Sequence, residues 1–254
     1  MAIYLKRSDE LEKMKGSSRV VAGCFRVAAD ALKPGITTAE IERLIVDHIE
    51  ASGARSAFKG YRGYPAYTCI SVNDQVVHGI PGDRKLNEGD IVSIDIGVEK
   101  DGYFGDAART FQVGEVTPEA KRLLEVTRGA LKKGTEMARD GNRLGDISNA
   151  VQRHVEEAGF SVVRDLVGHG IGRSMHEEPQ IPNFGRPGRG PRLRAGMVLA
   201  IEPMVNAGDW RVRTLEDKWT VVTEDGSLSA HFENTVAITP AGPLELTATD
   251  WEGH

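Results

Sequence analysis

Apolar residues recur at helical spacing in four segments of the chain, two in each half. Thr37 and Glu40 have the spacing of a capping box, and Pro118 follows Thr117 at the position where a first helical residue is expected. Ser8, Thr37 and Thr117 are predicted to cap the first three helices, and the fourth is predicted to begin at Asp146. The first three are predicted to end near Leu32, Gly53 and Ala138.

Residues 91–111 predict two strands joined by the turn Glu99-Lys100-Asp101-Gly102. The first strand has an entirely apolar face, which should be buried: Val92, Ile94, Ile96 and Val98. With the hairpin centred between Lys100 and Asp101, Asp95 lies directly opposite Asp106 on the other face. Opposed carboxylates about 5 Å apart destabilise a sheet unless a cation lies between them. The hairpin therefore predicts a cation site.

The second half of the chain repeats features of the first. An offset of 106 residues superposes six positions: Val20 on Val126, Gly23 on Gly129, Gly35 on Gly141, Ile41 on Ile147, His48 on His154 and Gly53 on Gly159. We expect a single α+β domain over residues 1–254, with two pseudo-symmetric helix-helix-sheet halves, about 8–115 and 116–250, whose antiparallel sheets surround a shared cleft. The alternative is chance similarity between amphipathic helices.

An offset of 107 residues brings the strand 91–95 onto residues 198–202, so that Glu202 matches Asp95. Glu233 lies in another predicted strand, 230–236, and completes a set of four carboxylates whose formal charge two divalent ions would neutralise. His169, flanked by Gly168 and Gly170, is the best nitrogen ligand. The alternative is that these are solvent-exposed strand acids and a packing histidine.

Ligands that are mostly oxygen suit Mn²⁺, Fe²⁺, Co²⁺ or Zn²⁺. Two such ions about 3.5–4 Å apart can bridge and acidify a water, and the resulting hydroxide attacks a carbonyl or phosphoryl centre. The predicted chemistry is therefore hydrolysis. No serine elbow, phosphate-binding loop or dinucleotide fingerprint in the sequence favours another reaction.

The net charge of −5 and a pI near 5.9 argue against a broad nucleic-acid-binding or membrane-binding face. The N-terminal residues MAIYLKRSDE lack the pattern of a signal peptide, and no apolar run is long enough for a membrane span. The two cysteines, Cys24 and Cys69, offer no disulfide framework. We therefore expect a cytoplasmic protein.

Several motifs make the chain resemble the type I methionine aminopeptidases, which share the pita-bread fold with prolidases and creatinases. The resemblance covers nearly the whole chain and rests on Tyr64-Pro65, Cys69, Asn73, His78-Gly79-Ile80-Pro81, Ser93-Ile94-Asp95-Ile96-Gly97, Gly105-Asp106, Gly168-His169-Gly170-Ile171-Gly172, His176-Glu177-Glu178-Pro179, Ile201-Glu202-Pro203 and Phe232-Glu233-Asn234-Thr235.

The resemblance implies roles for thirteen residues. The metal ligands would be Asp95, Asp106, His169, Glu202 and Glu233. His78 would contact substrate near the scissile bond, His176 would stabilise the tetrahedral intermediate, and Glu202 would also shuttle a proton. The methionine pocket would be lined by Phe58, Tyr61, Tyr64, Cys69, Met175 and Trp219. Phe58 replaces a smaller cysteine of many relatives, and Met175 replaces an aromatic residue.

The activity implied is removal of the initiator methionine from new proteins and peptides with a small second residue, by a metal-bridging hydroxide. The substrates would be the N-termini of nascent proteins and peptides, which the enzyme would bind at the ribosome. The chain would be a monomer. Two alternatives stay open: a proline-specific peptidase of the same fold, and a binding protein on this scaffold without catalysis.

Overall fold

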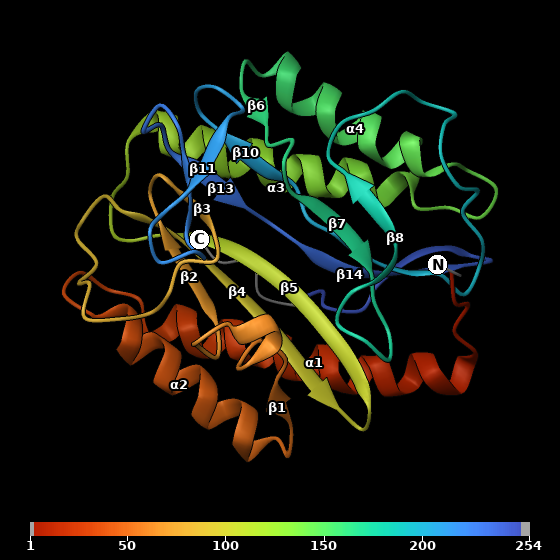
Figure 1. Cartoon of the computed structure of the whole chain (residues 1–254), viewed down its shortest axis with the longest axis horizontal. Coiled ribbons are helices and arrows are strands. Elements are labelled where there is room, and N and C mark those ends of the chain that lie inside the picture. Colours follow the sequence, from red (N-terminus) through yellow and green to blue (C-terminus); the bar gives the residue numbers. More distant parts are fainter. Residues whose placement is uncertain (1–2, 250–254) are drawn as a thin grey trace.

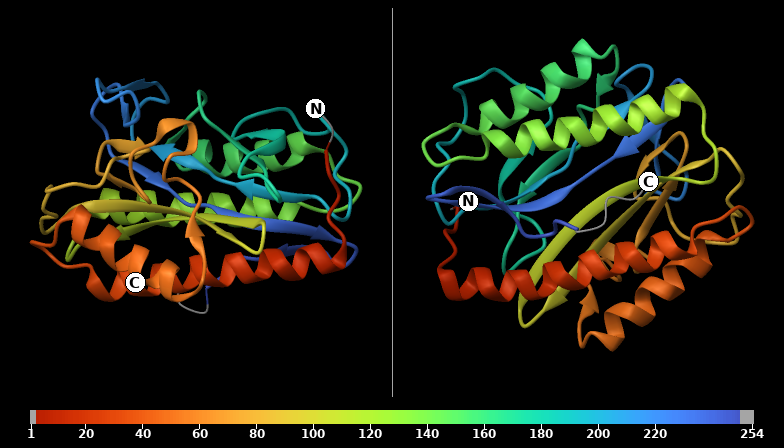
Figure 2. Two further views of the ribbon diagram at one scale, coloured as in Figure 1. Left: turned by 60° about the horizontal axis from the view of Figure 1, so that its bottom comes forward. Right: turned by 180° about the vertical axis from the view of Figure 1, so that it is seen from behind.

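The computed structural model of the chain describes residues 3–249, so the first two and last five residues of the predicted domain, including Asp250 at the end of its second half, lie outside the described range. The helices are α1 (Ser8–Ala31), α2 (Thr38–Ala51), α3 (Pro118–Met137) and α4 (Leu144–Glu157), with a short 3₁₀ turn at Tyr61–Gly63. The pairs α1–α2 and α3–α4 lie at opposite edges of the molecule, with the strands between them (Figure 1, Figure 2).

All paired strands are antiparallel, as predicted. One sheet contains β1 (Arg55–Ser56), β2 (Cys69–Val72), β4 (Ile91–Lys100) and β5 (Tyr103–Gln112). A second contains, in order, β15 (Gly242–Glu245), β14 (Asn234–Thr239), β9 (Val198–Ile201), β7 (Val167–Gly170) and β8 (Glu177–Pro182). Two smaller sheets contain β13 (Ser229–His231), β10 (Met204–Asn206) and β6 (Ser161–Val162), and β11 (Val212–Thr214), β12 (Val221–Thr223) and β3 (Gln75–Val77).

Two helix boundaries differ from the predictions for the same reason. The first helix is capped by Arg7, not Ser8, and the fourth begins at Leu144, before Asp146. Glu10 accepts a hydrogen bond from the backbone N–H of Arg7 at 3.0 Å, and Asp146 accepts one from that of Arg143 at 2.7 Å. An acid in the first turn thus satisfies the backbone donor ahead of the helix. The caps at Thr37 and Thr117 are confirmed.

The register of the β4–β5 hairpin corrects the sequence prediction. Asp101 and Gly102 both have positive φ, 53° and 77°, which is the pattern of a two-residue type I′ turn. The hairpin is therefore centred one residue later than expected, and Asp95 pairs with Ala108 while Asp106 pairs with Gly97. Since the pairing shifts by two residues, the two carboxylates remain on one face as diagonal neighbours.

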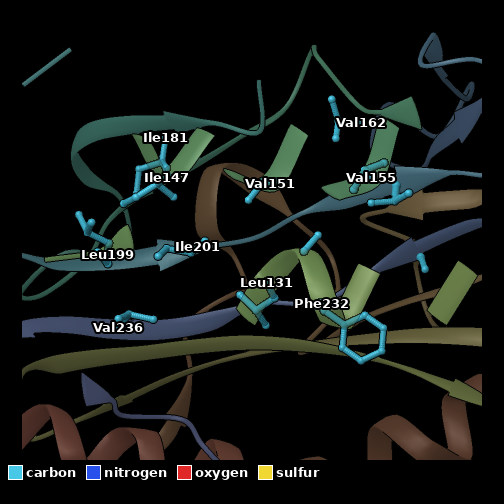
Figure 3. Close-up of a cluster of buried hydrophobic side chains, with 14 of the residues drawn as sticks. Leu131, Ile147, Val151, Val155, Val162, Ile181, Leu199, Ile201, Phe232 and Val236 are labelled. Atoms are coloured by element: carbon cyan, nitrogen blue, oxygen red, sulfur yellow. The ribbon is translucent and has the colours of Figure 1, made fainter. Parts of the chain in front are cut away.

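Each helix pair packs on the sheet of its own half. The apolar face of β4 is fully buried against α1 and α2, as predicted. Leu131, Ile147 and Val151 of α3 and α4 pack against Leu199 and Ile201 of β9 (Figure 3).

Glycine allows the same close helix contact in both halves. A methyl group on Gly23 would lie 2.4 Å from Nε2 of His48, and one on Gly129 would lie 2.4 Å from Nε2 of His154. These are residues that the 106-residue offset superposes. Within residues 3–249, none of the helices has the length and apolarity needed to cross a bilayer.

Candidate metal centre

The two halves of the chain meet where β5 lies beside β14 (Figure 1, Figure 2). Glu233 forms a bridge with Ala108 of β5, to whose carbonyl its backbone N–H donates at 2.9 Å. The Thr235 hydroxyl accepts from the N–H of Asp106 at 3.0 Å and donates to its carbonyl at 2.7 Å. Hydrogen bonds between the halves, all of them to the backbone of β5, therefore hold Asp106 and Glu233 close together.

Glu233 does not lie inside a strand, which corrects the prediction of one strand over 230–236. β13 ends at His231 and β14 begins at Asn234. Phe232 and Glu233 lie in the break, where the chain leaves one sheet for another and pairs briefly with β5. The interruption turns the Glu233 side chain into the interior, where it is 2% exposed.

Asp106, His169 and Glu233 each place a ligand atom within 4.8 Å of those of the other two. Nε2 of His169 also lies 3.7 Å from a carboxylate oxygen of Glu202. Asp95 lies two residue pairs along the hairpin from Asp106, as its diagonal neighbour on the same face, and lines the same cavity. The structure thus brings all five predicted ligands to one place.

His169 presents the nitrogen that a metal would need. Its Nδ1 lies 2.9 Å from the carbonyl oxygen of Gly170. A carbonyl only accepts, so Nδ1 carries the hydrogen and, in the neutral ring, Nε2 carries the lone pair. Nε2 faces Asp106 at 3.7 Å. Burial by itself would lower the pKa of His169, but the carboxylates of Asp106 and Glu202 outweigh it and raise the pKa.

The acids of this cluster are not fully hydrogen-bonded by the described part of the chain. Three buried oxygens have no hydrogen-bond partner among the described residues: Asp95 Oδ1, Asp106 Oδ1 and Glu233 Oε1. Burial, and then the charges of neighbouring carboxylates, raise the pKa of Asp95 and of Glu233 well above the ordinary range. A buried carboxylate without a partner lowers the stability of the folded state by roughly several kcal/mol unless a cation compensates its charge. The donor set therefore fits divalent cations.

A cavity of about 150 Å³ joins this cluster to an aromatic pocket. All thirteen residues singled out in the sequence line it; the remaining lining residue is Arg62. Cys69 pairs directly with Asp95 in the β2–β4 ladder and so connects the pocket to the acids. The Tyr64 ring meets Trp219 edge-on, with centroids 5.1 Å apart, and Phe58 at 6.5 Å.

Gly97 leaves room for the pocket on β4. A methyl group there would lie 2.5 Å from the Phe58 ring and 3.0 Å from Cε of Met175. Burial raises the pKa of the Cys69 thiol well above its usual value and also raises that of Tyr64, so both side chains are neutral. The wall is therefore uncharged, aromatic and rich in sulfur, which suits an apolar thioether side chain.

His78 and His176 lie on the cavity wall next to the acids. The His176 ring stacks on Tyr61 at 5.2 Å and lies 4.1 Å from the His169 ring, centroid to centroid. Burial, and then the neighbouring His169, lower the pKa of His176 to about 3, and burial lowers that of His78. Both rings are neutral near pH 7. His78 has φ 60°, a strained value for a non-glycine residue, next to Gly79, which contacts the Ile70 carbonyl.

Sequence reasoning missed His231. Its side chain is 2% exposed, and Nε2 lies 3.6 Å from Glu202 and 4.0 Å from Glu233 without a hydrogen-bond partner among the described residues. The predicted strand 230–236 could have indicated it, because His231 precedes Glu233 by two residues and alternate residues of a strand share a face.

Replacing Asp95 with asparagine is expected to stabilise the metal-free protein above neutral pH. The raised pKa means that the folded state holds this proton more tightly than the unfolded state, so wild-type stability falls as pH rises from about 4 through the raised value. Removing the charge should raise the free energy of unfolding by about 1–3 kcal/mol at pH 8. Each kcal/mol should raise Tm by about 2–4 °C. Thermal unfolding of chelator-treated protein from pH 5 to 8 measures this.

The matched control is Asp83→Asn in an exposed loop, which should follow the wild-type curve. Parallel pH curves for the wild type and Asp95→Asn would contradict the assignment of an uncompensated buried charge to Asp95.

Comparison with known proteins agrees with this geometry. Residues 12–240 match the model of metallopeptidase family M24. The chain is 56% identical over 245 residues to a methionine aminopeptidase of Clostridium perfringens, covering 96% of this chain and 98% of the relative. The crystal structure of a methionine aminopeptidase from Thermotoga maritima superposes with a TM-score of 0.95 at 50% identity, covering 97% of this chain and 99% of that one.

A prolidase from Pyrococcus horikoshii superposes with a TM-score of 0.80 at 24% identity, over 98% of this chain and 65% of that one, which establishes the shared fold. The predicted α+β pita-bread fold is therefore confirmed. The family match and the high identity over nearly the full length decide the relationship: the chain belongs to metallopeptidase family M24 and, within it, to the bacterial-type methionine aminopeptidases.

Proposed function

We propose that this chain hydrolyses the peptide bond after the N-terminal methionine of proteins and peptides whose second residue is small, using two divalent ions. One observation carries the proposal: four carboxylates and a histidine, which are metal-ligating residue types, line the same cavity of about 150 Å³ as an uncharged aromatic pocket. Relatives named as methionine aminopeptidases, at 56% and 50% identity, support it.

Asp95, Asp106, His169, Glu202 and Glu233 would hold the ions, which supply Lewis-acid chemistry by acidifying a water and polarising the scissile carbonyl. Four carboxylates balance two dications in formal charge. Ions of Co²⁺, Mn²⁺, Fe²⁺ or Zn²⁺ suit this set of oxygen and nitrogen ligands. The cavity of about 150 Å³, which the acids themselves line, is small, and this favours a free N-terminus over an internal segment of chain.

Protein groups around the acids supply the remaining steps. The methionine side chain enters between Tyr64, Cys69 and Trp219. His78 contacts the substrate beside the scissile bond, and neutral His176 donates a hydrogen bond to the carbonyl oxygen as it becomes an oxyanion. Glu202, whose side chain is 13% exposed, carries the proton to the leaving nitrogen.

Peptide hydrolysis separates this function from the alternatives. Metal-loaded protein should release methionine from Met-Ala-Ser and leave Xaa-Pro peptides intact, and a chelator should abolish the release. Cleavage of Xaa-Pro peptides would instead indicate a proline-specific peptidase. Absence of turnover with all four metals would indicate a binding protein on this scaffold.

We propose further that the enzyme acts in the cytoplasm, as a monomer, on chains that are leaving the ribosome. Two buried cysteines, Cys24 and Cys69, remain unpaired, as in a reducing compartment. Initiator methionine first becomes accessible on nascent chains, so the substrate chemistry favours this place. Cosedimentation with ribosomes and analytical ultracentrifugation would test the association and the monomeric state.

A further inference from the structure

The loop between β7 and β8 carries two residues of the proposed site. Met175 lines the methionine pocket, and His176 lies against the metal-ligand cluster. Together with the first residue of β8, this loop forms what we call the Gly172–Glu177 loop, which descends toward the N-terminal half of α1 (Figure 1). Met175 and His176 therefore depend on whatever fixes the loop.

Glu177 closes the loop on itself with one of its two carboxylate oxygens. Oε1 accepts hydrogen bonds from the backbone N–H of Arg173 at 2.8 Å and of Ser174 at 3.2 Å. Both amides precede Met175 and His176, and Glu177 follows them. The orientation of the Glu177 carboxylate thus sets the shape of the loop that it spans.

Lys6 holds the other oxygen of that carboxylate. Its Nζ lies 2.5 Å from Glu177 Oε2, with the two side chains only 5% and 10% exposed. The backbone N–H of Lys6 donates to the carbonyl of Gly196 at 2.7 Å, which fixes the N-terminal segment itself. A methyl group on Gly172 would lie 2.3 Å from Cε of Lys6 and 2.8 Å from Oε1 of Glu177, so any side chain there would displace the ion pair from its present position.

A second contact joins helix α1 to the same loop. Glu10 Oε1 accepts from Arg173 Nη2 at 2.9 Å and from the Tyr103 hydroxyl at 2.9 Å. The backbone N–H of Phe104 in β5 donates to the Gly172 carbonyl at 2.9 Å. Because Arg173 is 66% exposed while Lys6 is buried, the Lys6–Glu177 pair is the stronger restraint.

We propose that Lys6 is a positioning residue for catalysis: its ion pair with Glu177 holds the Gly172–Glu177 loop so that Met175 and His176 face the substrate. The inference rests on the proposed function for its kinetic part. Without Lys6, Glu177 is left as an uncompensated buried carboxylate and turns toward water, which releases the amides of Arg173 and Ser174.

We call the Lys6–Glu177 ion pair the clamp. Hydrogen exchange of the metal-free protein tests it without reference to activity. In Lys6→Met, amides of residues 172–177 should exchange about tenfold faster or more, while peptides from α3 and α4 are unchanged. Glu177→Gln should loosen the same segment. The matched control is Lys15→Met, which removes a lysine–glutamate pair within helix α1, Lys15–Glu12 at 2.6 Å, whose side chains are 33% and 65% exposed.

Kinetics on Met-Ala-Ser test the consequence for the site. Lys6→Met and Glu177→Gln should each lower kcat/KM by about 10- to 100-fold, through both a lower kcat and a higher KM. The double variant should be no worse than either single variant, since both remove one interaction. Lys6→Arg, which keeps the charge, should recover part of the loss, and Lys15→Met should match the wild type.

Wild-type exchange of the loop in both Lys6→Met and Glu177→Gln would overturn the clamp, as would additive losses in the double variant. If Lys6→Met does not fold, Glu177→Gln decides, because glutamine keeps the size of the side chain. A wild-type protein that fails to cleave methionyl peptides would contradict the proposed function instead, and the exchange comparison would still decide the clamp.

Discussion

Asp106→Asn is expected to yield a folded protein that has lost most of its divalent-metal affinity and nearly all peptide hydrolysis. Asp106 is buried, its Oδ1 lacks a partner among the described residues, and its carboxylate faces His169 at 3.7 Å. Losing even an outer partner of a metal ligand costs about 10–100-fold in affinity, so losing the ligand itself should cost about 100-fold or more. Mn²⁺ titration calorimetry and Met-Ala-Ser hydrolysis measure the two effects.

The fold should survive because the backbone of Asp106, held by Thr235 and the β4–β5 ladder, makes no use of the carboxylate. Asp101→Asn in the turn of the same hairpin is the matched control: it is exposed, has φ 53°, and asparagine tolerates that conformation. Metal affinity and turnover equal to the wild type in Asp106→Asn would remove Asp106 from the centre.

Glu202→Gln is expected to lower kcat by about 10²–10⁴-fold even when metal is saturating, because glutamine keeps the shape of the side chain but cannot carry a proton. Glu202 lies 3.7 Å from His169 and 3.6 Å from His231, and it lines the cavity. Single-turnover rates at metal concentrations fixed by a separate binding titration measure the chemical step.

Glu224→Gln, an exposed glutamate just beyond β12, provides the control and should leave kcat unchanged. If saturating metal returned the rate of Glu202→Gln to that of the wild type, Glu202 would be a ligand only, and another group would have to carry the proton.

The main features of the fold followed from the sequence because their causes are local. Helix caps at Thr37 and Thr117 use neighbouring residues, and the apolar face of β4 alternates with period two. The predicted register of the β4–β5 hairpin was wrong, because the turn is centred one residue later than predicted. The dipeptide Asp101-Gly102 favours a two-residue type I′ turn, and this preference outweighs the predicted turn centred between Lys100 and Asp101.

Short strands escaped prediction because tertiary pairing, not local pattern, forms them. β1 and β6 have two residues each and exist only by pairing with β4 and β10. The break at Phe232–Glu233 has the same origin, since the chain there leaves one sheet for another. No local periodicity encodes such an exchange of partners.

The candidate site was predictable where acids interrupt apolar strands, as at Asp95 and Glu202, because a buried carboxylate needs a cation or another compensating partner. His169 followed from its flanking glycines, whereas the pocket residues were added through the family resemblance. Lys6 and Glu177 could not be found in this way, because they are 171 residues apart and each is an ordinary surface residue type.

Anomalous diffraction from crystals grown with Mn²⁺ tests the central claim most directly. The account predicts two anomalous peaks in the cavity, enclosed by the side chains of Asp95, Asp106, His169, Glu202 and Glu233. Peaks elsewhere on the molecule, or a cavity without manganese, would contradict it.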